Sequence, residues 1–312
     1  MSRSTPASAS VEVPVVQLES KANNRTFFNR IRRMPRAWVG LALVLLVLLS
    51  AILAPMLTQL DPLTQFRDGL SDVGTPLPPN TQYILGTDHL GRDLWTRLLY
   101  GGQVSLAISI IANVTAAILG TLIGLLAGYY SGIIDSLLMR FTEVLLAFPA
   151  ILLALGLGSV LRPSIPVVIL ILAVITWPTL ARVVRSQVLS VRERQFIESA
   201  RCCGGGDWYI IFQHILPHTI TVTVVWMTLS IASSVLIEAS LSYLGVGVPP
   251  PTPSWGNMIS DGQTRYRLAP WMILIPTLAI LLTTLGFNLL GDAVRDALDP
   301  RTSHRSGVSK EK

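Results

Sequence analysis

Charged residues are scarce in this sequence. They make up 13% of its 312 residues, hydrophobic residues make up 51%, and the mean hydropathy is +0.55. Because a soluble domain carries roughly a quarter charged residues, these values exclude a soluble globular protein. The few lysines never follow glycine, so there is no Walker A loop and we expect no ATP site of the P-loop kind. The two cysteines, Cys202 and Cys203, exclude a disulfide framework and are typical of a reducing compartment.

A signal-peptide pattern is also missing. The first apolar run begins near Ala37 and is about twice as long as a signal-peptide core, so we expect it to be retained. Six runs reach the ~20 residues that cross the hydrocarbon layer, where helices satisfy the backbone polar groups. The sequence therefore predicts an all-α membrane protein with six transmembrane helices. They cover residues 37–60, 103–129, 137–160, 166–185, 219–244 and 271–291, with a proline kink at Pro149 in the third.

The basic residues indicate the orientation of these helices. The net charge is +6 and the isoelectric point about 9.7, yet no basic patch carries interleaved aromatic residues, so we expect no nucleic-acid partner. Of the 24 Lys and Arg residues, 18 lie on the side that holds both termini, which predicts that both termini are cytoplasmic. We expect residues 1–36 to be disordered with a basic juxtamembrane cluster, and residues 292–312 to form a cytoplasmic tail.

Residues 61–102 form the first predicted external loop. Prolines and glycines dominate its first part, and a short amphipathic helix is expected over residues 87–100, lying on the outer membrane surface. Thr87 would cap this helix and Gly101 would end it. Its expected i,i+4 ion pairs are Asp88–Arg92 and Asp93–Arg97.

The loop over residues 186–217 is long for a compact helical protein, which suggests that it has a function of its own. We expect one short helix over residues 192–203 and a second that Asp207 caps and that ends before Pro217. The glycines at 204–206 separate them. This pair would form a rigid knob that exposes apolar side chains unless a partner covers them. These side chains are Phe196, Ile197 and Ala200 from the first helix and Tyr209, Ile210 and Phe212 from the second.

The spacing within this loop resembles a known motif. Glu198-Ser199-Ala200 is followed by three residues, Gly204, nine residues, and then His214-Ile215-Leu216-Pro217. This order is similar to the EAA loop of permease subunits in binding-protein-dependent ABC importers, with the pattern E-A-A, x3, G, x9, I-x-L-P. Two positions depart from that pattern, because Ser199 replaces an alanine and His214 an isoleucine.

Three further stretches support the resemblance. Residues 85–106 resemble the G-T-D-x-x-G-R-D segment of the C-type permease of dipeptide, oligopeptide and nickel importers. Residues 238–256 and 287–301 resemble two more hallmark stretches of that subunit. The resemblance covers most of residues 37–301 and implies a type I ABC importer permease fold in the bacterial cytoplasmic membrane, with an external loop at 245–270.

In that family the EAA loop is a coupling element that docks on the ATPase. The resemblance therefore assigns coupling to Glu198, Ala200 and Gly204, whose left-handed turn a β-carbon would disfavour. The same loop contributes Ser199, His214, Leu216 and Pro217. The implied partners are a second, B-type permease, two ATP-binding subunits, a periplasmic or lipid-anchored binding protein and membrane lipid. We expect no catalysis and no cofactor on this chain, with ATP and Mg²⁺ on the partner ATPases.

The cargo implied by the resemblance is a small peptide, with nickel or glutathione as alternatives. An ion-coupled secondary transporter is the alternative from another class. His214 and His218 lack the H-E-x-x-H order, so no metal site is expected. Glu238 lies in a predicted span, where it either lines a translocation path with Ser234 and Ser242 or is a buried, hydrogen-bonded carboxylate. Four aromatic residues suit interfacial anchors, namely Tyr129, Tyr130, Trp255 and Trp271.

Overall fold

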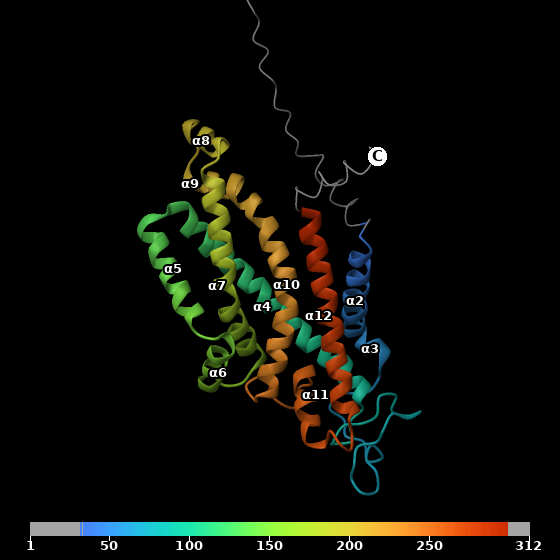
Figure 1. The fold of residues 1–312 in the computed structure, drawn as a ribbon. Coiled ribbons are helices and arrows are strands. Elements are labelled where there is room, and N and C mark those ends of the chain that lie inside the picture. Colours follow the sequence, from blue (N-terminus) through green and yellow to red (C-terminus); the bar gives the residue numbers. More distant parts are fainter. Residues whose placement is uncertain (1–31, 33, 299–312) are drawn as a thin grey trace, which may run out of the picture.

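Helices form the framework of the chain (Figure 1). The computed structural model describes residue 32 and residues 34–298, so most of the segment 1–36, which was expected to be disordered, and residues 299–312 of the predicted tail lie outside this part. Both predictions are wrong at their inner bounds, because α2 already begins at Pro35 and α12 continues to Leu298. Within it, β-structure is limited to two isolated bridges. The helices are α2 (Pro35–Ile52), α3 (Ala54–Leu57), α4 (Leu94–Tyr130), α5 (Gly132–Ala147), α6 (Ala150–Val160), α7 (Ile165–Arg192), α8 (Gln195–Cys202), α9 (Asp207–Tyr209), the π-helix η1 (Ile210–Ile215), α10 (Leu216–Tyr243), α11 (Trp255–Gly262), the 3₁₀-helix η2 (Gln263–Arg265) and α12 (Trp271–Leu298).

In the part of the chain that the structure describes, five helical segments are long and apolar enough to cross a membrane, and there are six if a bent pair is counted as one span. The five are α2, α4, α7, α12 and the continuous stretch Asp207–Tyr243, which confirms five of the predicted spans. The third span was predicted as one kinked helix. Instead α5 and α6 meet at 89°, because the chain is extended at Phe148 and Pro149.

The long helix α4 packs most extensively against α7. Glycines spaced four residues apart allow this close approach. A Cβ atom on Gly124 would lie 2.7 Å from the carbonyl oxygen of Ala181, and one on Gly128 would lie 2.7 Å from Cβ of Val188. Elsewhere α2 packs along α12, and α10 contacts both α4 and α12. Small residues therefore bring these helices together, as is common in membranes.

The helix predicted over residues 87–100 is wrong in its bounds and its setting. It begins at Leu94, where the carboxylate of Asp93 accepts a hydrogen bond from the Thr96 amide at 2.8 Å, and it continues through Gly101 to Tyr130 as α4. The glycine does not end the helix and is instead buried against the start of α11, with the carbonyl carbon of Ser254 3.4 Å from the position of a Cβ atom. The first turn is buried rather than spread on a surface.

The predicted capping and ion pairing of this segment change accordingly. Thr87 donates to the carbonyl of Gly69 at 2.6 Å instead of capping a helix. The pair Asp88–Arg92 is present at 2.6 Å. Asp93 caps α4, and the described ion pairs of Arg97 are with Asp88 and Asp261.

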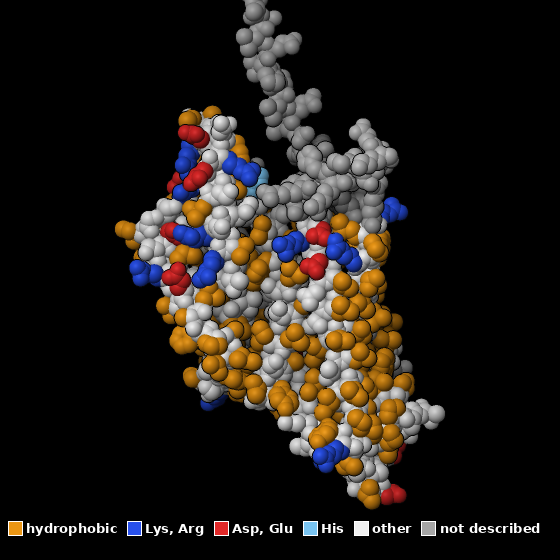
Figure 2. Space-filling model, in the orientation of Figure 1, with side chains coloured by type: hydrophobic (Ala, Val, Ile, Leu, Met, Phe, Trp, Pro, Cys, Tyr) orange, Lys and Arg blue, Asp and Glu red, His pale blue; other side chains and the backbone are white. Residues whose placement is uncertain are grey.

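The two ends of the molecule carry different elements (Figure 1). Helix α8 lies at the same end as the start of α2 and the end of α12, whereas α6, α11 and residues 58–93 lie at the opposite end. We call the latter the outer end. On the visible face most charged side chains gather toward the α8 end, and hydrophobic side chains cover the middle (Figure 2). The cytoplasmic placement of the termini stays a prediction.

Candidate functional site

The first half of the 186–217 loop folds as predicted. Helix α8 covers Gln195–Cys202 and ends in a Schellman motif, in which the Gly205 amide donates to the carbonyl of Ala200 at 3.0 Å and the Gly204 amide to that of Arg201 at 2.9 Å. The φ angle of Gly204 is +82°, so the predicted left-handed turn is present. Since a side chain is strained there, glycine is the residue that this turn favours.

The second half of the loop differs from the prediction. No separate helix ends before Pro217, because α9, η1 and α10 run on as one helical stretch from Asp207 to Tyr243. Pro217 lies in the first turn of α10, directly after the π-helical segment. The cap is Gly206 rather than Asp207, whose carboxylate accepts a hydrogen bond from Tyr129. The knob is therefore α8 folded back on an extension of α10.

We call residues 195–215 the wedge. Its underside is apolar, since Ile197, Ile210 and Ile215 are buried in one cluster with valines of α7 such as Val188. The prediction that Ile197 and Ile210 form part of an exposed apolar face is thus wrong. The exposed large hydrophobic side chains of the wedge are Phe196, Trp208, Tyr209 and Phe212.

Polar contacts tie the wedge to the end of α4. The Tyr129 hydroxyl donates to the Asp207 carboxylate at 2.7 Å, and the Arg201 guanidinium lies 5.5 Å from the centre of the Tyr129 ring. Arg192, the last residue of α7, donates to the carbonyls of Gly128 and Tyr129 at 3.2 and 3.1 Å. Tyr129 thus fastens the wedge to α4, and Arg192 holds the end of α7, on which the wedge packs, against the end of α4.

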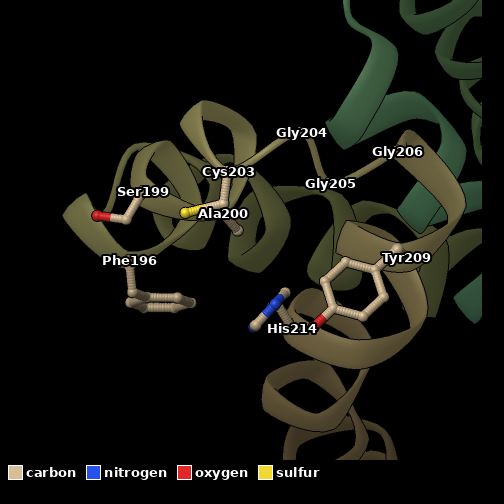
Figure 3. A pocket seen from close by; sticks show the side chains of 9 residues that line it. All are labelled: Phe196, Ser199, Ala200, Cys203, Gly204, Gly205, Gly206, Tyr209 and His214. Atoms are coloured by element: carbon tan, nitrogen blue, oxygen red, sulfur yellow. The ribbon is translucent and has the colours of Figure 1, made fainter.

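A hollow of about 650 Å³ opens between α8 and the start of the α9–η1 segment (Figure 3). The predicted coupling residues Ser199, Ala200, Gly204 and His214 all line it. The His214 ring meets the Tyr209 ring edge-on with centroids 5.3 Å apart. This side of the wedge is open to a partner.

The other three predicted coupling residues lie elsewhere. Glu198 is exposed and lines a separate hollow of about 500 Å³ together with Arg192, Arg194 and Arg201. Leu216 packs against the buried cluster under the wedge, and Pro217 is exposed at the start of α10. The seven residues therefore divide between an open hollow, a charged flank, a supporting core that includes Leu216, and the exposed start of α10 at Pro217.

The second predicted site is at the outer end. Glu238 is fully buried, and its carboxylate accepts hydrogen bonds from the hydroxyls of Ser105 at 2.9 Å and Ser242 at 2.8 Å. Ser234 is also buried and accepts from the Asn113 amide at 2.7 Å. The hydrogen-bonded alternative for Glu238 is thus confirmed for this conformation. A role in the translocation path stays a prediction.

Sequence reasoning missed the residues that fasten these sites. Tyr129 and Trp255 were expected to be interfacial anchors, but both are buried, and Trp255 donates from its indole to the carbonyl of Leu98 at 3.0 Å. The partner of Tyr129 is Asp207, 78 residues away. One signal was present: Tyr129 ends a predicted span where a polar aromatic group meets the cytoplasmic loops.

Two family profiles match the chain. The family described as the binding-protein-dependent transport system inner membrane component matches residues 120–304. The N-terminal transmembrane domain of oligopeptide transport permease C matches residues 25–79. The first match covers more than half of the chain, including the wedge and the buried Glu238.

Individual proteins are similar over most of the chain. A protein of Brucella suis biovar 1 (strain 1330), which its name proposes as a peptide transport system permease, is 43% identical over 273 residues, covering 87% of this chain and 90% of that protein. The glutathione transport system permease protein GsiD of Escherichia coli O6:K15:H31 (strain 536 / UPEC) is 44% identical over 276 residues, covering 88% and 89%.

A solved structure shows the same fold. An inward-facing structure of the MetNI methionine ABC transporter contains a chain that superposes with a TM-score of 0.54 at 20% identity, covering 66% of this chain and 98% of that one. The fold is thus that of a type I ABC importer permease, and the ion-coupled transporter that the sequence left open is not supported. The chain belongs to the family of binding-protein-dependent transport system inner membrane components and is a multi-pass inner-membrane permease of an ABC importer.

Proposed function

We propose that this permease imports small peptides as one of two non-identical permease subunits. The proposal is supported by the names of two relatives, one for peptide transport and one for glutathione transport, each more than 40% identical over most of the chain. Glutathione is itself a tripeptide, so it is the second candidate cargo. Neither of these two relatives names nickel, which stays the third candidate.

The wedge is the feature that supports a coupling role. We propose that it docks on one of two ATPase subunits, which hold ATP and Mg²⁺, while this chain performs no covalent chemistry. Because Tyr129 fastens the wedge to α4 and the buried isoleucines fasten it to the valines of α7, a displacement of the wedge would carry both helices with it. Closure of the ATPases would thus open the cavity between the two permeases toward a binding protein docked at the outer end.

The cargo is tested with the assembled importer, reconstituted in vesicles with its ATPases, second permease and binding protein. We expect ATP-dependent uptake of labelled dialanine, measured against labelled glutathione and ⁶³Ni²⁺. Uptake of glutathione alone would replace the first candidate by the second. Uptake of nickel alone would overturn the peptide proposal.

The coupling role is tested by reversing the charge of Glu198. The side chain is exposed at the first turn of α8, so Glu198→Arg should leave insertion and assembly intact. We expect peptide-stimulated ATP hydrolysis and uptake to fall at least tenfold. The matched control is Asp292→Arg, the same reversal on an exposed residue of α12 at the same end but outside the wedge. Wild-type coupling in Glu198→Arg would contradict the assignment.

A further inference from the structure

A cavity of about 640 Å³ lies at the outer end, away from the wedge. Its wall combines the segment that leads into α4, the loop that follows α10 and one side of α11. The charged and polar side chains in this wall include Arg92, Arg97, Asp261 and Asn257. None of the predicted coupling residues lines this cavity, so the polar side chains in its wall need another explanation.

Arg97 is the most unusual of these side chains. It is 3% exposed, and it lies in the first turn of α4. Its Nη2 lies 3.3 Å from the Asp261 carboxylate, and its Nε lies 3.3 Å from Asp88 without hydrogen-bond geometry. Nε and Nη1 both lack a hydrogen-bond partner. Since a guanidinium carries five donors and a buried unsatisfied donor is costly, Arg97 has the capacity to bind a further acceptor.

The charge of the wall favours an anion. Two guanidinium groups, those of Arg92 and Arg97, line the cavity against one carboxylate, that of Asp261. Asp88 lies behind the wall and is already paired with Arg92 at 2.6 Å. Partial burial lowers the pKa of His89, against the opposing influence of Asp261 and Asp88, which favours the uncharged ring.

A metal ion is the competing occupant. Ligand atoms of Asp88, His89 and Asp261 lie within 4.8 Å of one another, which is close enough to hold a cation. Both carboxylates, however, already face the guanidinium groups of Arg92 and Arg97 at 2.6–3.4 Å. These positive charges oppose a cation, whereas a carboxylate matches the fork of an arginine.

We propose that this outer cavity binds the terminal carboxylate of the peptide cargo, with Arg97 as the principal donor. The inference rests on the proposed peptide function. In this proposal the permease, and not its binding protein alone, recognises the free carboxyl end of the peptide. Arg92 holds Asp88 and Asp261 in place beside Arg97, and so positions the site.

The test uses the assembled importer in nanodiscs without the binding protein, so that binding to the permeases is observed directly. Isothermal titration calorimetry compares dialanine with its C-terminal amide. We expect the amide to bind at least tenfold more weakly than the free acid. Arg97→Gln should weaken binding of the free acid at least tenfold, to the level of the amide. Arg267→Gln, the same change on an exposed arginine outside the cavity wall, should leave both affinities unchanged.

A second variant covers the case in which Arg97→Gln fails to assemble. Ser260→Leu fills part of the cavity and keeps every charge, and it should also weaken binding of the free acid. Equal binding of acid and amide, or no binding of either, would overturn this inference even where vesicle uptake of dialanine confirms the peptide function. Absence of peptide uptake in vesicles would instead overturn the proposed function. Loss of binding on addition of a chelator would favour the metal ion.

Discussion

At the outer end, ionisable side chains such as Glu238 and Arg97 are almost completely buried and joined to other helices by hydrogen bonds and ion pairs. At the wedge the reverse holds, because the isoleucines are buried and the charged and aromatic side chains are exposed. Buried polar networks fix one arrangement and are costly when left incomplete. An exposed mixed surface on an apolar base is suited to a partner that binds and moves.

Helix α4 connects the two regions. Ser105, near its start, donates to Glu238, and Tyr129, near its end, donates to Asp207 in the wedge. The same helix packs along α7, whose last residue, Arg192, binds the end of α4. We call the buried network around Glu238 the rigid outer anchor. We expect it to stay folded under conditions in which the wedge opens, with both regions attached to α4.

The largest effect is expected from Glu238→Ala. The change leaves the hydroxyls of Ser105 and Ser242 without their buried acceptor, and Ser105 also accepts from the Trp255 amide, so α4, α10 and α11 lose a common contact. We expect a loss of about 3 kcal/mol in stability. The apparent Tm of the assembled importer, measured in detergent by loss of the monodisperse complex, should fall by several degrees.

Two variants control this result. Glu143→Ala removes an exposed carboxylate from α5 and should leave the Tm unchanged. Glu238→Gln keeps one acceptor oxygen and the shape of the side chain, so the Tm of this variant should lie between those of Glu238→Ala and Glu143→Ala. The rigid outer anchor would be refuted by a Glu238→Ala complex as stable as the Glu143→Ala complex.

A smaller effect is expected from Gly204→Val. No atom lies within 4 Å of the position of an added Cβ, so the penalty arises from the backbone, with φ at +82°. We expect about 1–2 kcal/mol of local destabilisation at the turn. Gly206→Val is the matched control, since its φ is −71° and the space around it is also open. Trypsin cleavage within residues 192–206, followed by mass spectrometry, should accelerate in the first variant only.

The spans and the EAA loop were predictable because local pattern determines them. Apolar runs of the right length mark the helices, and the Glu198–Gly204 spacing marks the left-handed turn that the structure contains. The Schellman geometry follows from one glycine at the right distance from a short helix. Such features depend on residues that are neighbours in the chain.

The errors share a different cause. Gly101 was expected to end a helix, yet α11 packs on it from 150 residues away in the sequence and α4 continues. Pro217 was expected to follow a helix end, but the π-helical segment accommodates it and the helix runs on. The buried setting of Arg97 depends on Asp261, again far away in the sequence. Local propensity could not include these tertiary contacts.

The smallest effect concerns the fastening between α4 and the wedge. Tyr129→Phe removes the 2.7 Å hydrogen bond to Asp207 and keeps the ring that Arg201 approaches, so we expect a loss of about 1 kcal/mol. Tyr130→Phe removes an equivalent hydroxyl from the next residue, which is 38% exposed. The rate of hydrogen exchange at the wedge amides, followed by mass spectrometry, should rise about fivefold in Tyr129→Phe, the factor that 1 kcal/mol implies, and stay unchanged in Tyr130→Phe.

Because Asp207 is exposed, water can replace the lost donor, which is why this change ranks below the two others. Equal exchange in both variants would show that the buried isoleucines alone hold the wedge.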